Sequence, residues 1–255
     1  MKNIIVIPAR MGSSRFPGKP LINIKKIPMV VHVWVRCKML NLVEEVYIAT
    51  CDNIIKEVCE KYGAKVIMTS KKHKMCMERV AEAVKKIPCK NIITVQGDEP
   101  LIQKNDIEIV RKKIEKLKKY ESVSLVQKIK IAKEINNKNR VKVIMNKRKK
   151  ILYISRETIP SKNFFKNYKN YYKLGNIYGM SKNFLNIYPK LKASKLEKLE
   201  SVDMNRIIDY DYNLYGVESK SNLVSVDVPN DLKIVNKLIV KDTFFKKYKN
   251  YYAKS

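Results

Sequence analysis

The sequence predicts an α/β fold with a mostly parallel central sheet. Three observations support this fold class. Short apolar runs typical of buried strands alternate with longer helical patterns through the first 120 residues. A length of 255 residues suits one large domain with a subdomain. From about residue 122 onward strand-like segments follow one another closely, which predicts a β-rich lobe.

The first half of the chain carries the strand–helix alternation. Strands are expected at 4–7, 46–50, 65–68 and 91–96, and helices at 30–40, 53–62, 79–86 and 106–118. This order predicts parallel strands covered by helices on both faces of the sheet. Ligands of such sheets bind at the carboxyl ends of strands. The loops that reach this edge follow Ile7, Thr50, Met68 and Gln96.

We expect the β-rich lobe at about 122–190, inside a single domain that spans 1–240. The lobe is expected to contain strands at 122–130, 141–145 and 151–155, a hairpin turn at 146–150, and a Tyr-rich loop or short helix at 164–172. After it we expect a helix at 196–208, a last core strand at 223–226 and a helix at 229–239. The basic, aromatic tail 241–255 is expected to pack as a helix end or to fray.

Composition narrows the class of protein. The net charge is +30, but the lysines are spread along the whole chain, which favours a solvated basic surface over a nucleic-acid patch. The five cysteines show no C-x-x-C spacing and are expected to be reduced thiols. No apolar run approaches the roughly 20 residues of a membrane span. We therefore expect a cytoplasmic protein that binds neither nucleic acid nor membrane.

The segment from Pro8 to Lys19 follows the first predicted strand directly. Backbone N–H groups in such a turn can surround an anion, and Gly12 permits close approach of a phosphate. Arg10 and Lys19 can neutralise phosphate oxygens. The Walker pattern is not met, because Pro20 follows Lys19. These features favour triphosphate binding over an ordinary Gly- and Ser-rich loop.

Two aspartates also follow predicted strands. Asp98 belongs to the segment V-Q-G-D-E-P, and a carboxylate at the end of a buried strand is unfavourable unless it is hydrated, paired or metal-bound. Asp227 precedes Pro229 and, taken alone, is most simply a helix-capping residue. Mg²⁺ needs few protein carboxylates because phosphate and water complete its shell. Asp98 and Asp227 together could therefore supply a metal site.

Over residues 4–240 the chain resembles the 3-deoxy-manno-octulosonate (Kdo) cytidylyltransferases. Seven of the family's segments occur in the right order, at 7–21, 95–100, 137–143, 153–160, 177–179, 196–203 and 226–232. The resemblance implies a Rossmann-like nucleotide-binding fold of the nucleotide-diphospho-sugar transferase type. It also implies Mg²⁺, CTP as the donor, and a homodimer built through the β-rich lobe.

The resemblance also implies roles for individual residues. Arg10, Lys19 and Asp98 are the expected catalytic residues. Nucleotide contacts are implied for Arg10, Ser13, Arg15, Lys19, Gln96, Glu78 and Arg79, metal binding for Asp98 and Asp227, and sugar contacts for Arg156, Tyr178 and Glu200. We expect no histidine to act as a general base, because His32 lies in an apolar helix and His73 in a basic loop.

Three segments depart from the family pattern. Met75-Cys76-Met77 replaces S-G-T, Lys173 or Leu174 stands where the family has a histidine, and the helix segment Glu-Gln-Leu-Arg has become Asp203-Met204-Asn205-Arg206. The reaction implied is transfer of CMP from CTP to the anomeric hydroxyl of Kdo, for surface lipopolysaccharide synthesis, with release of pyrophosphate. A different acidic sugar (a nonulosonic acid or amino-Kdo) and a weakened paralogue remain alternatives.

Overall fold

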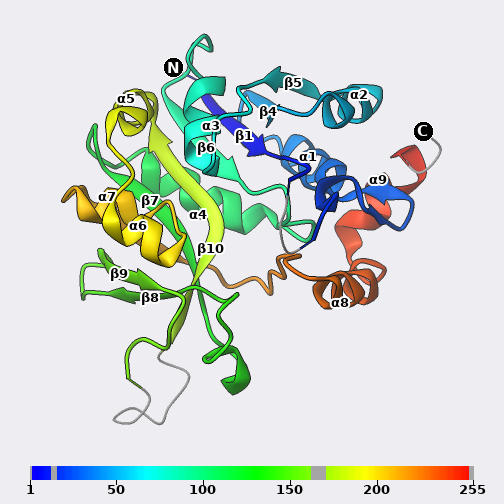
Figure 1. Ribbon diagram of the computed structural model, residues 1–255. Coiled ribbons are helices and arrows are strands. Elements are labelled where there is room, and N and C mark those ends of the chain that lie inside the picture. Colours follow the sequence, from blue (N-terminus) through cyan, green and yellow to red (C-terminus); the bar gives the residue numbers. More distant parts are fainter. Residues whose placement is uncertain (1, 13–15, 162–170, 253–255) are drawn as a thin grey trace.

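We describe a computed structural model that covers residues 2–12, 16–161 and 171–252, with a nine-stranded sheet at its centre (Figure 1). The strands along the main path lie in the order β11-β7-β10-β6-β1-β4-β5. Their bounds are β1 Asn3–Pro8, β4 Glu45–Thr50, β5 Lys65–Met68, β6 Asn91–Val95, β7 Ser122–Lys128, β10 Tyr172–Ser181 and β11 Leu214–Glu218. A separate small hairpin pairs β2, Asn23–Ile24, with β3, Ile27–Pro28.

The central sheet is mostly parallel, as the sequence predicts. β1 pairs in parallel with β4 and β6, and β4 with β5. β10 runs antiparallel to both of its neighbours in this path, β6 and β7, while β11 is parallel to β7. The carboxyl ends of β1 and β6 therefore lie side by side at one edge of the sheet.

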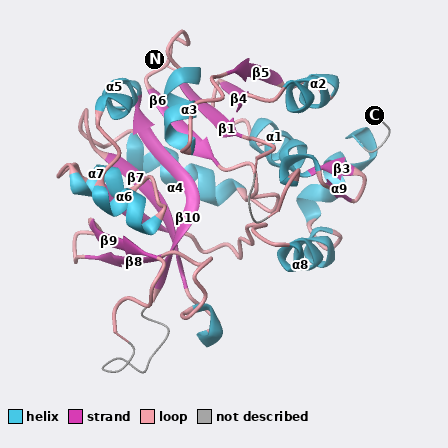
Figure 2. Cartoon of the chain, in the orientation of Figure 1, coloured by secondary structure: helices cyan, strands magenta, loops and turns pink. Residues whose placement is uncertain are grey.

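Helices cover both faces of this sheet (Figure 2). Ile5 and Ile7 of β1 belong to one apolar cluster and Ile4 and Val6 to another, so the strand is buried on both faces. The first cluster takes side chains from α1 Met29–Met39, α2 Asn53–Lys61, α4 Lys104–Ile114, α8 Pro229–Ile239 and α9 Thr243–Tyr252. The second takes side chains from α3 Cys76–Ala83, α5 Lys182–Ile187 and α7 Asn205–Asp209.

The β-rich lobe is continuous with the central sheet. β8, Lys142–Met145, pairs with β10 and with β9, Ile151–Ser155, so β10 is shared by both parts. The predicted turn at 146–150 closes this hairpin, with the Asn146 N–H donating to the Lys150 carbonyl at 3.0 Å. Most of the predicted Tyr-rich segment, 162–170, lies outside the described residues.

Three element predictions need correction, and two strands lie where none was expected. The helix expected at 79–86 is α3 and begins three residues earlier, where the Met77 N–H donates to Asp203. The helix expected at 196–208 is divided into α6, Lys195–Glu200, and α7, because Ser201 adopts a left-handed conformation with φ of 50°. The strand expected at 223–226 is wrong: this buried segment crosses the end of β6, and the Val226 N–H donates to the Asp98 carbonyl. Strands β10 and β11 were not expected.

The tail forms a packed helix. Tyr248 of α9 is buried, and its hydroxyl lies 2.8 Å from His32 Nδ1 and 3.2 Å from Arg36 Nε of α1. Burial lowers the pKa of His32 to about 4, so this histidine is neutral and structural. All five cysteines are free. Within the described part of the chain, no helix has the length and apolarity to cross a membrane.

Candidate active site

A cavity of about 600 Å³ opens at the carboxyl ends of β1 and β6, the edge at which the sequence predicts ligand binding. Two walls enclose it. One, the strand-end wall, consists of residues 8–10, Gly12, Lys19, 96–98 and Asp227. The other, the helix-side wall, consists of residues 73–76, Arg79, Arg156 and 201–203. β10 contributes Leu174, Asn176 and Tyr178 between them.

The strand-end wall brings Lys19 and Asp98 together. Lys19 Nζ lies 2.6 Å from Asp98 Oδ2, although 79 residues separate the two in sequence. Gly18 makes this possible because its φ of 70° turns the chain back toward β1 just before Lys19. Gly97 allows β6 to exit beside β1, since a Cβ there would lie 3.1 Å from the Pro8 carbonyl oxygen.

Arg10 lines the same wall and is exposed, so its charge faces the cavity entrance. Ser13 and Arg15, predicted to contact the nucleotide, lie outside the described residues. The wall thus presents two cations, Arg10 and Lys19, beside backbone that is free of bulky side chains at Gly12. This combination suits the charge of a triphosphate.

Asp98 also has the free oxygen that a metal site needs. Its Oδ1 is buried and has no hydrogen-bond partner within the described structure. The hydrogen bond from Val226 N–H to the Asp98 carbonyl, 3.0 Å, brings Asp227 onto the same wall. No group of three or more His, Cys, Asp or Glu side chains among the described residues forms a closed metal cage. Two carboxylates with room for substrate oxygens fit Mg²⁺, which keeps few protein ligands.

Glu99 forms a carboxylate pair with Asp98 in the sequence, but it was assigned no role at the site from the sequence. It is buried, and it accepts hydrogen bonds from Asn176 Nδ2 at 2.8 Å and from the Ser225 hydroxyl. Burial, with the neighbouring Asp98 charge, raises the pKa of Glu99 to about 8. A protonated Glu99 therefore joins β6, β10 and the segment before Asp227 without adding charge. Its place in V-Q-G-D-E-P was the available signal.

The departure at 75–77 lies in the helix-side wall. Met75 and Cys76 line the cavity, and Gln96 Nε2 donates to Cys76 Sγ at 2.8 Å. Burial and the nearby Asp203 charge raise the pKa of the Cys76 thiol well above its usual value. The thiol therefore stays protonated and links Gln96 of one wall to Asp203 of the other. Among the other departures Leu174 lines the cavity, whereas Met204 is buried in the core.

Glu78 is held by the protein rather than presented to the cavity. It lies 2.9 Å from Arg206, which also pairs with the buried Glu197 at 2.6 Å. Arg79 does line the cavity, and it donates to the Thr69 hydroxyl. His73 lines the cavity too and pairs with Glu82, a placement that sequence reasoning did not predict.

Arg156 and Glu200 form one unit, of which only Arg156 is among the lining residues. The Arg156 N–H donates to Glu200 Oε2 at 2.8 Å, and Arg156 Nε donates to the Glu200 carbonyl at 2.7 Å. Further guanidinium N–H groups donate to the carbonyls of Ser201 and Lys138. The third residue predicted to contact a sugar, Tyr178, lines the cavity, and burial raises the pKa of its phenol.

Comparisons with known proteins identify the family of this fold and cavity. The profile of the cytidylyltransferase family matches residues 4–219. The 3-deoxy-manno-octulosonate cytidylyltransferase 2 of Hydrogenovibrio crunogenus is 36% identical over 245 residues, covering 94% of this chain and 98% of the relative. The 8-amino-3,8-dideoxy-manno-octulosonate cytidylyltransferase of Shewanella pealeana is 34% identical, covering 92% and 97%.

Solved structures agree with this relationship. CMP:2-keto-3-deoxy-manno-octonic acid synthetase complexed with CTP superposes with a TM-score of 0.85 at 34% identity, covering 94% of this chain and 99% of that one. A 4-diphosphocytidyl-2C-methyl-D-erythritol synthase from Anaerococcus prevotii shares the fold alone, with a TM-score of 0.63 at 13% identity. The chain therefore belongs to the cytidylyltransferase family and is a nucleotidyltransferase.

Proposed function

We propose that this chain transfers CMP from CTP to the anomeric hydroxyl of a 2-keto-3-deoxy acid sugar, Kdo in the first instance, and releases pyrophosphate. The observation that carries the proposal is the strand-end wall, where Lys19 pairs with Asp98, Asp98 Oδ1 has no hydrogen-bond partner among the described residues, and Asp227 lines the same cavity. The names of the relatives support CTP as donor and a Kdo-type acceptor.

Different parts of the cavity have different roles in this reaction. The acceptor hydroxyl attacks the α-phosphorus in line and its oxygen bonds to phosphorus, while the bond from the α-phosphorus to the bridging oxygen breaks and pyrophosphate leaves. The hydroxyl proton passes to solvent. Arg10 and Lys19 neutralise the negative charge that develops on the leaving pyrophosphate. When bound to Asp98 and Asp227, Mg²⁺ supplies further charge neutralisation at the phosphate. Arg156 of the helix-side wall and Tyr178 of β10 orient the acidic sugar, so positioning contributes much of the rate.

The proposal also includes a homodimer and a cytoplasmic location. Leu152 of β9 and Leu199 of α6 are apolar, exposed by 48% and 72%, and belong to neighbouring parts of the chain. Burial of such side chains supports a homodimer built through this region. CTP and activated sugars are cytoplasmic metabolites, which supports a cytoplasmic enzyme in lipopolysaccharide precursor synthesis. Size-exclusion chromatography with light scattering tests the dimer directly.

Pyrophosphate release tests the reaction. We expect release with CTP, Mg²⁺ and Kdo, and none when ATP, GTP or UTP replaces CTP. Release without any acceptor, or equal release with all four nucleotides, would contradict the proposal. Mass spectrometry of the product should find CMP joined to the sugar.

The same assay should include a second acceptor, the 8-amino analogue of Kdo, because the cavity wall differs from the family pattern. Met75 and Cys76 line the cavity where the family pattern has S-G, and relatives at 34% identity are named as 8-amino-3,8-dideoxy-manno-octulosonate enzymes. A hydroxyl and an amine differ in hydrogen bonding and charge, and sites built around one discriminate against the other. The ratio of kcat/KM for Kdo and its 8-amino analogue decides between the two acceptors.

A further inference from the structure

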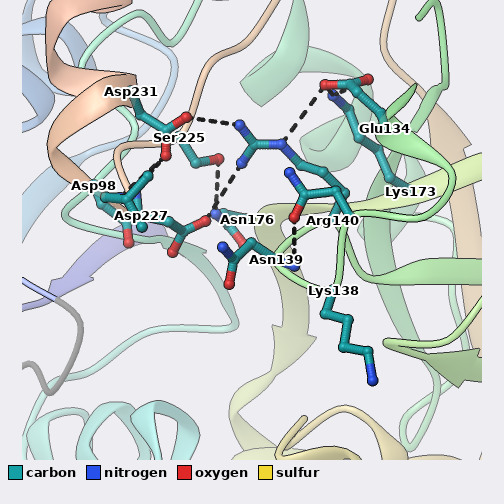
Figure 3. A network of polar contacts seen from close by, with 12 residues as sticks. Asp98, Glu134, Lys138, Asn139, Arg140, Lys173, Asn176, Ser225, Asp227 and Asp231 are labelled. Carbon is teal, nitrogen blue, oxygen red and sulfur yellow. Dashed lines mark hydrogen bonds and ion pairs between the residues drawn. The ribbon is translucent and has the colours of Figure 1, made fainter. Parts of the chain in front are cut away.

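Arg140 lies in the loop before β8 and reaches toward the Asp227 side of the cavity (Figure 3). Its NH1 is 3.5 Å from Asp227 Oδ2 and its NH2 is 2.9 Å from Asp231 Oδ1. On the opposite side its Nε is 3.6 Å from Glu134. The Arg140 side chain is only 15% exposed, so these charges interact with little screening by solvent.

Asp231 makes the link between Arg140 and Asp227 stronger than the direct contact alone. Its Oδ2 accepts hydrogen bonds from the backbone N–H groups of Asp227 at 3.0 Å and Val228 at 3.1 Å, at the start of α8. Its Oδ1 accepts from Arg140 at 2.9 Å. Arg140 therefore acts on the Asp227 side chain directly and on the Asp227 backbone through the helix cap.

Arg140 is also anchored independently of Asp227. Glu134 pairs with it and with Lys173, whose Nζ lies 3.1 Å from the same Glu134 oxygen. Asp231 and Glu134 thus hold the guanidinium from two directions (Figure 3). The contact to Asp227, at 3.5 Å, is longer than that to Asp231. Arg140 consequently stays in place even when Asp227 also contacts another cation.

The two carboxylates of the proposed metal site are therefore each paired with a cation in this ligand-free arrangement, although Asp227 shares its cation with Asp231 and Glu134. Asp98 is paired with Lys19, and Asp227 with Arg140. A triphosphate offers Lys19 another partner and adds negative charge of its own. A divalent cation that arrives without nucleotide meets two carboxylates that are already paired, and the positive charges of Lys19 and Arg140 repel it.

We propose that Arg140 is a positioning residue that fixes Asp227, and that its charge makes divalent-cation binding depend on CTP. This inference rests on the proposed function, because it concerns the same metal site. Cation and nucleotide are then coupled: each binds better in the presence of the other, by the same factor. Removing the Arg140 charge should weaken that coupling, whereas an arginine with a purely structural role would leave it unchanged.

The test measures Mn²⁺ binding by electron paramagnetic resonance, with and without CTP and in the absence of any acceptor. Wild type should bind Mn²⁺ more tightly with CTP. Arg140→Gln can still donate to Asp231 but lacks the charge, and should bind Mn²⁺ about tenfold more tightly than wild type without CTP. Arg140→Lys keeps the charge and should stay within about threefold of wild type.

Two further variants locate the effect. Arg148→Gln, in the exposed β8–β9 turn, removes the same charge far from the cavity and should stay within about twofold of wild type. When Asp227→Asn is combined with Arg140→Gln, the tighter Mn²⁺ binding of Arg140→Gln without CTP should be lost. Unchanged or weaker nucleotide-free binding in Arg140→Gln, or equal Mn²⁺ affinity of wild type with and without CTP, overturns the inference.

Failure of this inference differs from failure of the proposed function. If wild type releases pyrophosphate with CTP and Kdo while Arg140→Gln leaves Mn²⁺ binding unchanged, the inference about Arg140 alone is wrong. If Asp227→Asn binds Mn²⁺ as wild type does, both the metal site and the inference are wrong. If wild type releases no pyrophosphate, the proposed function is wrong.

Discussion

The two walls of the cavity use charge in opposite ways. In the strand-end wall Arg10 is exposed and Asp98 keeps an unpaired buried oxygen, so charged groups remain ready for a ligand. In the helix-side wall, by contrast, Arg156 donates to three backbone carbonyls. The strand-end wall therefore keeps a carboxylate oxygen without a hydrogen-bond partner among the described residues, whereas the charge of Arg156 also holds together the backbone of its wall. Mutations should affect activity in the first wall and stability or acceptor choice in the second.

The largest effect should come from Asp98. Asp98→Asn removes the carboxylate that faces Lys19 and the proposed metal, and turnover should fall by a factor on the order of 10³. Its circular dichroism spectrum and unfolding midpoint should stay close to those of wild type. Asp209→Asn, at the exposed end of α7, is the matched control and should keep full activity. Turnover near the wild-type rate in Asp98→Asn would remove this residue from the chemistry.

Substitution of Arg206 tests whether its ion pairs stabilise the protein behind the helix-side wall. It is buried between Glu78 and Glu197, so Arg206→Met leaves the buried Glu197 carboxylate without its partner. We expect the free energy of unfolding in urea to fall by about 3–5 kcal/mol. Arg111→Met breaks a partly exposed ion pair within α4 and should lower it by less than about 1 kcal/mol. Similar losses of unfolding free energy in Arg206→Met and Arg111→Met would contradict this distinction between a buried and a partly exposed ion pair.

Substitution of His32 tests whether a neutral, buried histidine stabilises the protein behind the strand-end wall. Its pKa in the folded state is about 4, against 6.5 as the reference, so its contribution to stability is present above pH 6.5 and is lost as pH falls toward 4. The size of this loss is about 3 kcal/mol. His32→Gln cannot titrate, and its unfolding free energy should fall less steeply than that of wild type over this range. Parallel pH dependences of the two proteins would mean that His32 is not held neutral.

Substitution of Cys76 should have the smallest effect of these variants, on the KM for the acceptor. Cys76→Ala removes the thiol that lies between Gln96 and Asp203, a loss of about 1 kcal/mol in acceptor positioning. The KM for the acceptor should rise about fivefold, while the KM for CTP stays near the wild-type value. Cys89→Ala, outside the cavity lining, should change neither constant. An equal rise for both substrates would assign Cys76 to the nucleotide side.

Prediction from sequence worked best where the signal was local. The strand before Pro8 and the carboxylate after β6 could be identified because apolar runs and turn residues mark strand ends. β10 was missed because its sequence, with Gly175 and Gly179 among polar and aromatic residues, lacks a regular alternation. Gly179 packs where a Cβ would lie 2.7 Å from Val123, a constraint that only the folded sheet reveals.

The helix-side wall was less predictable for a related reason. Its contacts join residues far apart in sequence, such as Glu78 with Arg206 and Met77 with Asp203. The family resemblance implied ligand contacts for Glu78, which is retained beside the altered segment 75–77, and for Glu200, which lies in a matched segment. The structure places both against arginines of the wall, and their proposed roles at a ligand stay predictions.

The docking of α9 on α1 has a consequence for how the enzyme matures. His32 and Arg36 precede their partner Tyr248 by more than 200 residues, so during translation α1 is made long before the segment that covers it. Domains fold as units once their distant contacts can form. A ribosome-bound chain that stops before α9 leaves the buried Arg36 and His32 facing solvent. The support behind the nucleotide loop is thus assembled late, after most of the chain has left the ribosome.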